Sequence, residues 1–111
     1  MNYLLDTCAL IWLVNNAVEL SPRARQACLA PSSGIMVSVA SAWEIALKQA
    51  RGKLALSQPV AQWWNHALQR YSLTEVPISA SIAMASVALP PIHADPADRL
   101  LAATALEHQL T

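Results

Sequence analysis

The sequence predicts a three-layer αβα fold of the α/β class, in which helices cover both faces of a mainly parallel sheet. Short apolar runs of strand type alternate with segments of helical spacing along the whole chain. The 111 residues are 55% hydrophobic and 13% charged, so the chain can bury one continuous core. The chain has only two glycines and no serine-rich or charged tract, so it shows no segment of linker composition. We therefore expect residues 1–111 to fold as a single domain.

The expected elements follow from residue type and spacing. Short apolar runs, β-branched in the second case, predict the strands Met1–Leu5, Ile35–Val39 and Thr74–Ile78. Apolar residues at intervals of three and four predict the helices Thr7–Val14, Ser21–Leu29, Ser41–Arg51, Ser57–Tyr71, Ser79–Leu89 and a last one starting at Asp95-Pro96.

Capping residues, proline and glycine mark the helix boundaries. Ser21 before Pro22 suits a helix start, because the serine oxygen can accept from a free backbone amide and proline loses no hydrogen bond at the first position. Gly52 suits the end of the helix before it, and Pro90-Pro91 stops the alanine-rich helix. These signals place each helix between two strand-like or loop-like segments.

Charge and composition exclude several classes of protein. Seven basic and seven acidic residues balance, so a phosphate-binding surface has to be local. The longest apolar stretch, Cys8 to Val14, is too short to span a membrane, which predicts a soluble cytoplasmic protein that does not bind membranes. Cys8 and Cys28 lack the spacing of a zinc site or a CxxC motif, and we expect both to be buried thiols in a reducing compartment.

Four of the seven acidic residues fall at strand ends or in first helical turns: Asp6, Glu44, Asp95 and Asp98. In parallel sheets, ligands gather at the carboxyl ends of the strands, where helix N-termini also point. Carboxylates clustered there repel one another unless a divalent cation neutralises them, and oxygen ligands favour Mg²⁺ or Mn²⁺. The pattern therefore indicates a metal site.

Each acid also has a purely local interpretation. Ser41-x-x-Glu44 matches a capping box, in which Glu44 reaches back to the serine amide. Asp95 suits an N-cap and Asp98 an acid favoured by the helix dipole. Asp6 can cap a helix as well, although burial next to Leu4-Leu5 would be costly without a partner.

Three ordered blocks resemble the PIN-domain family, specifically its VapC-type ribonuclease toxins: Leu4 to Trp12, Ser38 to Lys48 and His93 to Ala103. The resemblance extends across nearly the whole chain. It implies an Mg²⁺- or Mn²⁺-dependent endoribonuclease that hydrolyses RNA to a 5′-phosphate and a 3′-hydroxyl. It also implies a homodimer that a cognate antitoxin holds silent.

The resemblance implies a role for each matching residue. Asp6 is expected as the central metal ligand, Asp98 as a second ligand and Glu44 as a ligand or an orienter of metal-bound water. Asp95 matches a further family acid, and Thr7 is expected to hydrogen-bond a carboxylate or a water.

For binding of substrate, Arg99 is a candidate phosphate or carboxylate partner. Basic side chains that could contact RNA phosphates are Lys48, Arg51, Lys53 and Arg99. His93 also matches a family position, and Lys48 could instead pair with Glu44 on the helix surface.

In the family, a further strand and an acidic residue normally follow the helix that starts at Asp95-Pro96, and this chain ends at Thr111. Either the fourth carboxylate is dispensable, or another chain supplies it, or the site is weakened. The rival hypothesis is therefore a PIN-like binding module that cuts poorly and pairs with an antitoxin or with itself. Four tryptophans in a chain without Phe fit either an interface or core filling. An aspartyl-phosphate enzyme is disfavoured, because Asp6-Thr7-Cys8 lacks the second acid.

Overall fold

The computed structural model describes residues 2–30, 34–89 and 95–108. Its strands are β1 (Asn2–Leu5), β2 (Gly34–Ser38) and β3 (Thr74–Val76). Its helices are α1 (Thr7–Val14), α2 (Pro22–Leu29), α3 (Val39–Ala50), α4 (Val60–Arg70), α5 (Ala80–Ala88) and α6 (Pro96–His108). Strands and helices thus alternate as the sequence predicts.

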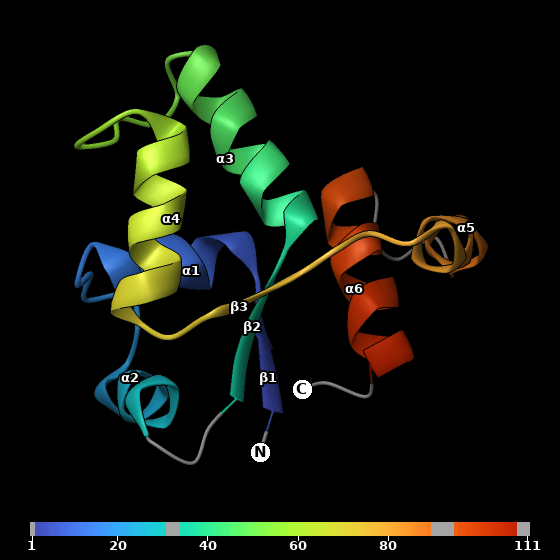
Figure 1. Ribbon diagram of the computed structural model, residues 1–111, viewed down its shortest axis with the longest axis horizontal. Coiled ribbons are helices and arrows are strands. Elements are labelled where there is room, and N and C mark those ends of the chain that lie inside the picture. The colour runs from blue at the N-terminus through green and yellow to red at the C-terminus, as the bar shows by residue number, and fades with distance from the viewer. Residues whose placement is uncertain (1, 31–33, 90–94, 109–111) are drawn as a thin grey trace.

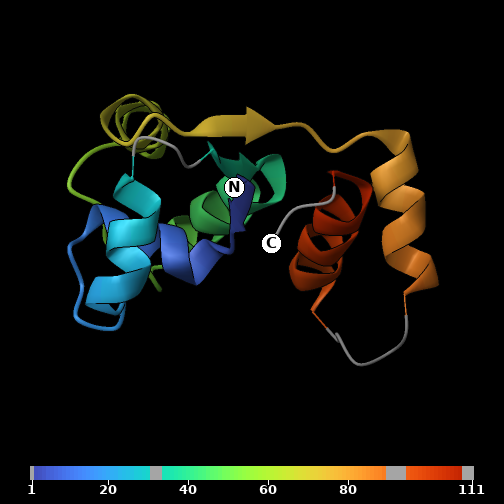
Figure 2. The same ribbon diagram turned by 90° about the horizontal axis from the view of Figure 1, so that it is seen from below.

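The strands form one parallel sheet in the order β1-β2-β3. Asn2 pairs with Gly34 at one end of the β1–β2 ladder, and Ser38 pairs with Val76 at the end of the β2–β3 ladder. Helices α1, α2 and α4 lie on one side of the sheet, and α5 and α6 lie on the other (Figures 1 and 2). The α/β class and the layered architecture are therefore confirmed.

The main core lies between the sheet and the helices of the first side. Alternate residues of β2, Ile35 and Val37, point into it, where they join Leu10 and Leu13 of α1 and Ile45 of α3. All five side chains are at most 2% exposed. Burying a side chain of this size contributes about 1.5 to 3 kcal/mol, so this cluster holds α1 and α3 against the sheet.

Most helix starts agree with the sequence prediction. Ser21 and Ser79 accept hydrogen bonds from Ala24 N and Ile82 N, as N-caps do. Strand β3 is shorter than expected, because Pro77 follows Val76 and has no backbone N–H to donate to a ladder.

The boundary between β2 and α3 differs from the prediction. Helix α3 begins at Val39, two residues earlier than expected, because Ser38 is its N-cap and accepts from Ala40 N at 3.0 Å. The capping box that we expected between Ser41 and Glu44 does not form. Ser41 is instead fully buried in the first turn of α3.

The tryptophans divide between the core and the surface. Trp63 and Trp64 of α4 are buried, and Trp64 Nε1 donates to Glu75 Oε1 of β3 at 2.7 Å. Trp12 is partly buried against the same core, whereas Trp43 is 55% exposed. Within the described ranges, no helix has the length and apolar character needed to cross a membrane.

The prediction that both cysteines are buried is wrong for Cys8, which is exposed. Helix α1 turns Leu10 and Leu13 inward, so the second residue of the helix faces outward. Cys28 is half-buried against the core, and this burial raises the pKa of its thiol, while the nearby Arg25 charge lowers it.

The two thiols are therefore expected to react with maleimide at different rates near neutral pH. Cys8 reacts first because it is exposed, and Cys28 reacts slowly because burial limits both access and thiolate formation. Mass spectrometry over time checks the order, and Cys8→Ser should remove the fast phase. Equal rates at both positions would contradict the packing of α2.

Candidate active site

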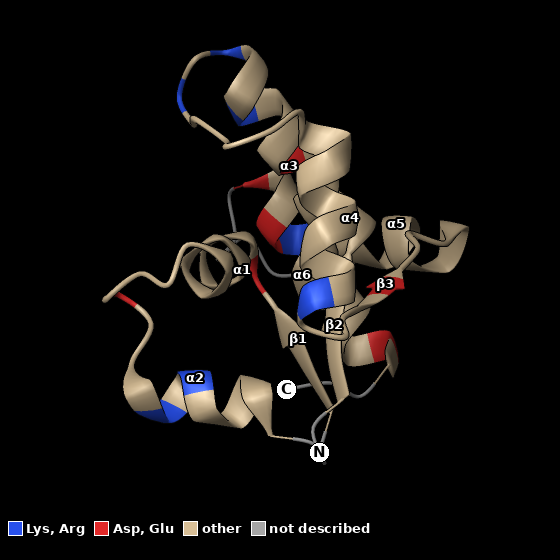
Figure 3. Ribbon diagram, turned by 60° about the vertical axis from the view of Figure 1, so that its left-hand side comes forward, with Lys and Arg blue, Asp and Glu red and all other residues tan. Residues whose placement is uncertain are grey.

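The acidic residues gather where three helices meet at the carboxyl ends of β1 and β2. Helix α1 begins two residues after β1, α3 follows β2 directly, and α3 packs against both α1 and α6. Figure 3 shows acidic positions at the start of α1, in α3 and at the start of α6 on the same side of the molecule. This is the edge where parallel sheets place their ligands.

Thr7 is hydrogen-bonded to α3. Its side chain is 3% exposed, and Oγ1 lies 2.6 Å from Glu44 Oε1 and 3.0 Å from Ser41 Oγ. A hydroxyl has one proton and a carboxylate has none, so Thr7 donates to Glu44 and can accept from Ser41. The contact fixes one oxygen of Glu44 beside the residue that follows Asp6.

Asp6 is an N-cap in this structure. Its Oδ1 accepts from Ala9 N at 2.7 Å, and its backbone adopts the extended conformation typical of a cap. The side chain is exposed, so the cost of burial that weighed against the local interpretation does not arise, and the cap left open by the sequence is present. The carboxylate is accessible to solvent and to a ligand.

The two aspartates at the start of α6 lie outside the core as well. Asp95 Oδ1 accepts from Ala97 N at 2.8 Å, which confirms its local capping role. Asp98 is exposed in the first turn of α6, where a negative charge interacts favourably with the helix dipole. The position of His93 falls outside the described residues.

A surface groove of about 530 Å³ joins α3 to the start of α6. Its acidic lining residues are Glu44 and Asp95, and Lys48 Nζ lies 3.6 Å from Glu44 Oε2. The expected helical pair between these residues is therefore present. Three predicted phosphate contacts share the groove: Lys48, Arg51 and Lys53.

The donor set fits Mg²⁺ or Mn²⁺ in chemistry, because it consists of carboxylate oxygens. The described side chains do not converge on one ion, however: among them, no three His, Cys, Asp or Glu residues could hold a metal together. Asp6 and Asp95 bond to amides of their own helices, and Glu44 bonds to Thr7 and Lys48. Each contact of Asp6 and Asp95 uses one carboxylate oxygen, so the second oxygen of each is the one that a metal would bind.

Arg99 has a different environment from the one expected for a phosphate contact. Its Nε donates to Ser86 O at 2.9 Å, and Nη2 donates to Val87 O and Leu89 O at 3.0 and 2.8 Å. These carbonyls end α5, so the guanidinium caps that helix from α6. Arg99 thus joins two helices, and we no longer assign it to RNA.

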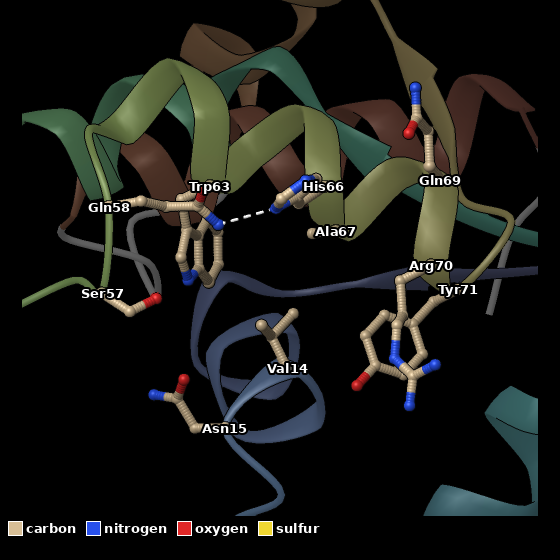
Figure 4. A pocket seen from close by; sticks show the side chains of 10 residues that line it. All are labelled: Val14, Asn15, Ser57, Gln58, Trp63, His66, Ala67, Gln69, Arg70 and Tyr71. Atoms are coloured by element: carbon tan, nitrogen blue, oxygen red, sulfur yellow. Dashed lines mark hydrogen bonds between the residues drawn. The ribbon is translucent and has the colours of Figure 1, made fainter.

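A second groove, of about 540 Å³, lies between the end of α1 and α4 (Figure 4). Gln58 Nε2 and His66 Nδ1 are hydrogen-bonded across its rim at 2.8 Å, and Arg70 lies over the Tyr71 ring. Residue spacing did not point to this groove, because its lining comes from two segments far apart in the chain and contains no recognisable motif. Its lining contains no carboxylate, so it does not belong to the acidic site.

The Thr7 contact leads to a stability prediction. Thr7→Val keeps the shape of the side chain but leaves Glu44 without its donor, and we expect the free energy of unfolding to fall by about 1 kcal/mol. Urea unfolding checks this value. Thr7→Ser keeps the hydroxyl and is the matched control, expected to recover most of the loss. If Thr7→Val is as stable as Thr7→Ser, the hydrogen bonds of the Thr7 hydroxyl do not contribute to the free energy of unfolding.

Comparison with known proteins identifies the family of the chain. The sequence model of the PIN domain family matches residues 3–111. Ribonuclease VapC22 of Mycobacterium tuberculosis (strain ATCC 25618 / H37Rv) is 34% identical over 106 residues, which are 95% of this chain and 79% of that protein. No solved structure gives a significant match.

Proposed function

Since the chain belongs to the PIN domain family and is of the VapC ribonuclease type, we propose that it is a divalent-metal-dependent endoribonuclease toxin. Mg²⁺ or Mn²⁺ is the proposed cofactor, with Asp6, Glu44 and Asp98 as its ligands. Asp95 and Thr7 complete the proposed catalytic set. The proposed substrate is RNA, and a cognate antitoxin is the proposed inhibitor.

The hydrogen bond between Thr7 and Glu44 is the observation that carries the proposal. It joins residues 37 positions apart at 2.6 Å and brings α3 against the residue directly after Asp6. Glu44 also lines the groove that Asp95 borders. These two contacts support the proposal because they put Glu44 at the same edge of the sheet as Asp6 and Asp95.

The residues of the chain have distinct tasks in the proposed reaction. A divalent ion held by these carboxylates would lower the pKa of a water molecule bound to it and would offset the charge of the phosphate. Thr7 holds one Glu44 oxygen in place, and Lys48 offsets the charge of the other oxygen. Asp6 and Asp95 lie at helix N-termini, where each accepts a backbone amide hydrogen bond.

The proposal also covers the compartment, the oligomeric state and the binding partner of the protein. We place it in the cytoplasm as a homodimer that binds antitoxin and does not bind membranes. Residues 1–111 would act as one PIN domain. These assignments rest on the family and on the similarity to Ribonuclease VapC22.

One observation favours the alternative of a weakened binding module. Asp6 and Asp95 act as helix caps, and the described acids do not converge on one ion. In that case the acids stabilise helix starts, and the domain serves to bind an antitoxin or a second copy of itself. The two functions differ in metal binding and in cleavage.

Calorimetric titration with Mn²⁺, followed by RNA cleavage in the same buffer with and without EDTA, tests the proposal. Micromolar-range binding together with cleavage that EDTA stops is the expected result. A folded protein that binds no Mn²⁺ and leaves RNA intact would favour the binding module. The 5′-phosphate on the products distinguishes the proposed hydrolysis from cleavage by a contaminating nuclease that leaves a 2′,3′-cyclic end.

A further inference from the structure

One wall of the acidic groove carries an exposed tryptophan beside basic residues. Trp43 is 55% exposed, and it lines the groove together with Lys48, Arg51 and Lys53. In the described part of the chain, no other Trp and no Tyr is exposed. The exposed indole face is large, flat and apolar, so it is available for stacking with a planar ligand in the groove.

The helix geometry gives these side chains a common direction. Trp43, Leu47 and Arg51 follow one another at intervals of four residues, which places them along one stripe of α3. The groove begins beside Glu44 in the first half of this helix and continues to its end. A ligand along the stripe would therefore pass from the acidic residues to the basic ones.

The turn after α3 fixes the basic residues. Gly52 has a φ of 71°, its N–H donates to Gln49 O at 3.0 Å, and Lys53 N–H donates to Lys48 O at 2.9 Å. These two bonds form a Schellman motif, which ends the helix in one defined conformation. Arg51 and Lys53 are thus carried on an ordered backbone, and their side chains are exposed.

The charge at this end of the groove is positive although the whole chain is neutral. Three of the seven Lys and Arg residues line the groove. Glu44 pairs with Lys48, which leaves Arg51 and Lys53 as the exposed cations beyond the acids. Figure 3 shows the basic positions at the end of α3 and in the loop that follows it. A polyanion is the ligand that this charge complements.

We propose that the stripe from Trp43 to Lys53 is the docking surface for single-stranded RNA, with one unpaired base stacked on Trp43 and backbone phosphates at Arg51 and Lys53. The inference rests on the proposed ribonuclease function, because it names how the substrate enters that site. Base stacking on an exposed indole requires an unpaired base, which is why a single strand is favoured over a duplex.

Fluorescence anisotropy of a labelled short single-stranded RNA, measured in EDTA so that nothing is cut, tests the proposal. We expect Trp43→Leu to weaken binding by about tenfold, within the range for one base stacked on an aromatic residue. Trp43→Phe keeps an aromatic face and should recover most of this loss. Arg51→Ala with Lys53→Ala should lower the salt dependence of the association constant by about 1.4 in log–log slope, since each phosphate contact contributes about 0.7.

Matched controls lie elsewhere on the surface. Arg23→Ala with Arg70→Ala removes two exposed cations from α2 and α4, and Leu106→Ala removes an exposed apolar side chain from α6. All three changes should leave RNA binding within about twofold of the wild type, because none of the three residues lines the groove. Circular dichroism confirms that each variant folds.

Several results would overturn the docking surface. If Trp43→Leu and Trp43→Phe bind RNA as tightly as the wild type, Trp43 is not part of the RNA-binding surface. If either variant differs from the wild type in molecular mass by light scattering, Trp43 is a contact between two copies of the chain. Polyglutamate is the probe for an acidic protein segment. If it displaces RNA from the wild type, and if Trp43→Leu and Trp43→Phe weaken polyglutamate binding to the same extent, the groove would be assigned to such a segment. RNA binding with the expected pattern but no cleavage in Mn²⁺ would reject the ribonuclease and leave the surface intact.

Discussion

Asp6→Asn is expected to lower RNA cleavage by about 100-fold or more while leaving the protein folded. Replacement of a group that merely orients a metal ligand already costs 10- to 100-fold, and Asp6 is the proposed central ligand. Asparagine caps helices about as well as aspartate does, so Ala9 N keeps its acceptor. The free energy of unfolding should therefore fall by about 0.5 kcal/mol, through the lost charge at the helix N-terminus. Cleavage assays and urea unfolding check the two parts.

Two further variants separate the cap from the metal ligand. Asp6→Ala removes both roles and should cost about 1 kcal/mol or slightly more in stability. Ser21→Ala removes the corresponding cap of α2, far from the acids along the chain, and should cost about the same in stability with full cleavage retained. If Asp6→Asn cuts RNA and binds Mn²⁺ as the wild type does, Asp6 is only a helix cap, and the binding module becomes the better hypothesis.

Arg99→Ala is expected to lower the free energy of unfolding by about 2 kcal/mol, because three carbonyls at the end of α5 lose a charged donor. Figure 2 shows α5 on the outer side of α6, and α6 is the element against which it mainly packs. The loss should therefore be local. Hydrogen exchange checks this: amides of α5 should exchange faster, whereas those of α1 and α3 keep their protection.

Arg99→Lys is the matched comparison for this prediction. Lysine keeps the positive charge but lacks the planar fork that serves several acceptors at once, so an intermediate loss of stability is expected. A phosphate-binding role would give the opposite pattern, in which Arg99→Ala weakens RNA binding while α5 keeps its protection. That result would restore the role that the sequence resemblance implied.

The alternation of strands and helices was predictable because it depends on local chemistry. Ser21 and Ser79 cap the helices that they were expected to start, since the serine oxygen and the amide it accepts from are three residues apart. Apolar spacing predicted helix α1 for the same reason, and Leu10 and Leu13 of that helix are buried. The start of α3 was misplaced because Ser38 and Ser41 are both acceptable caps. In the structure Ser38 accepts from Ala40 N, whereas the Ser41 hydroxyl is bonded to Thr7 of another helix.

By itself, the sequence determined the α/β class, most element boundaries and the set of acidic residues. All of these depend on residues that are near one another in the chain. The tertiary structure alone decided which partner each polar side chain has, because those partners come from other elements. Glu44 accepts from Thr7 rather than forming a capping box, Arg99 ends α5 rather than reaching outward, and Trp43 is exposed where Trp63 is buried. Such choices follow from how helices pack on a sheet, which residue spacing does not encode.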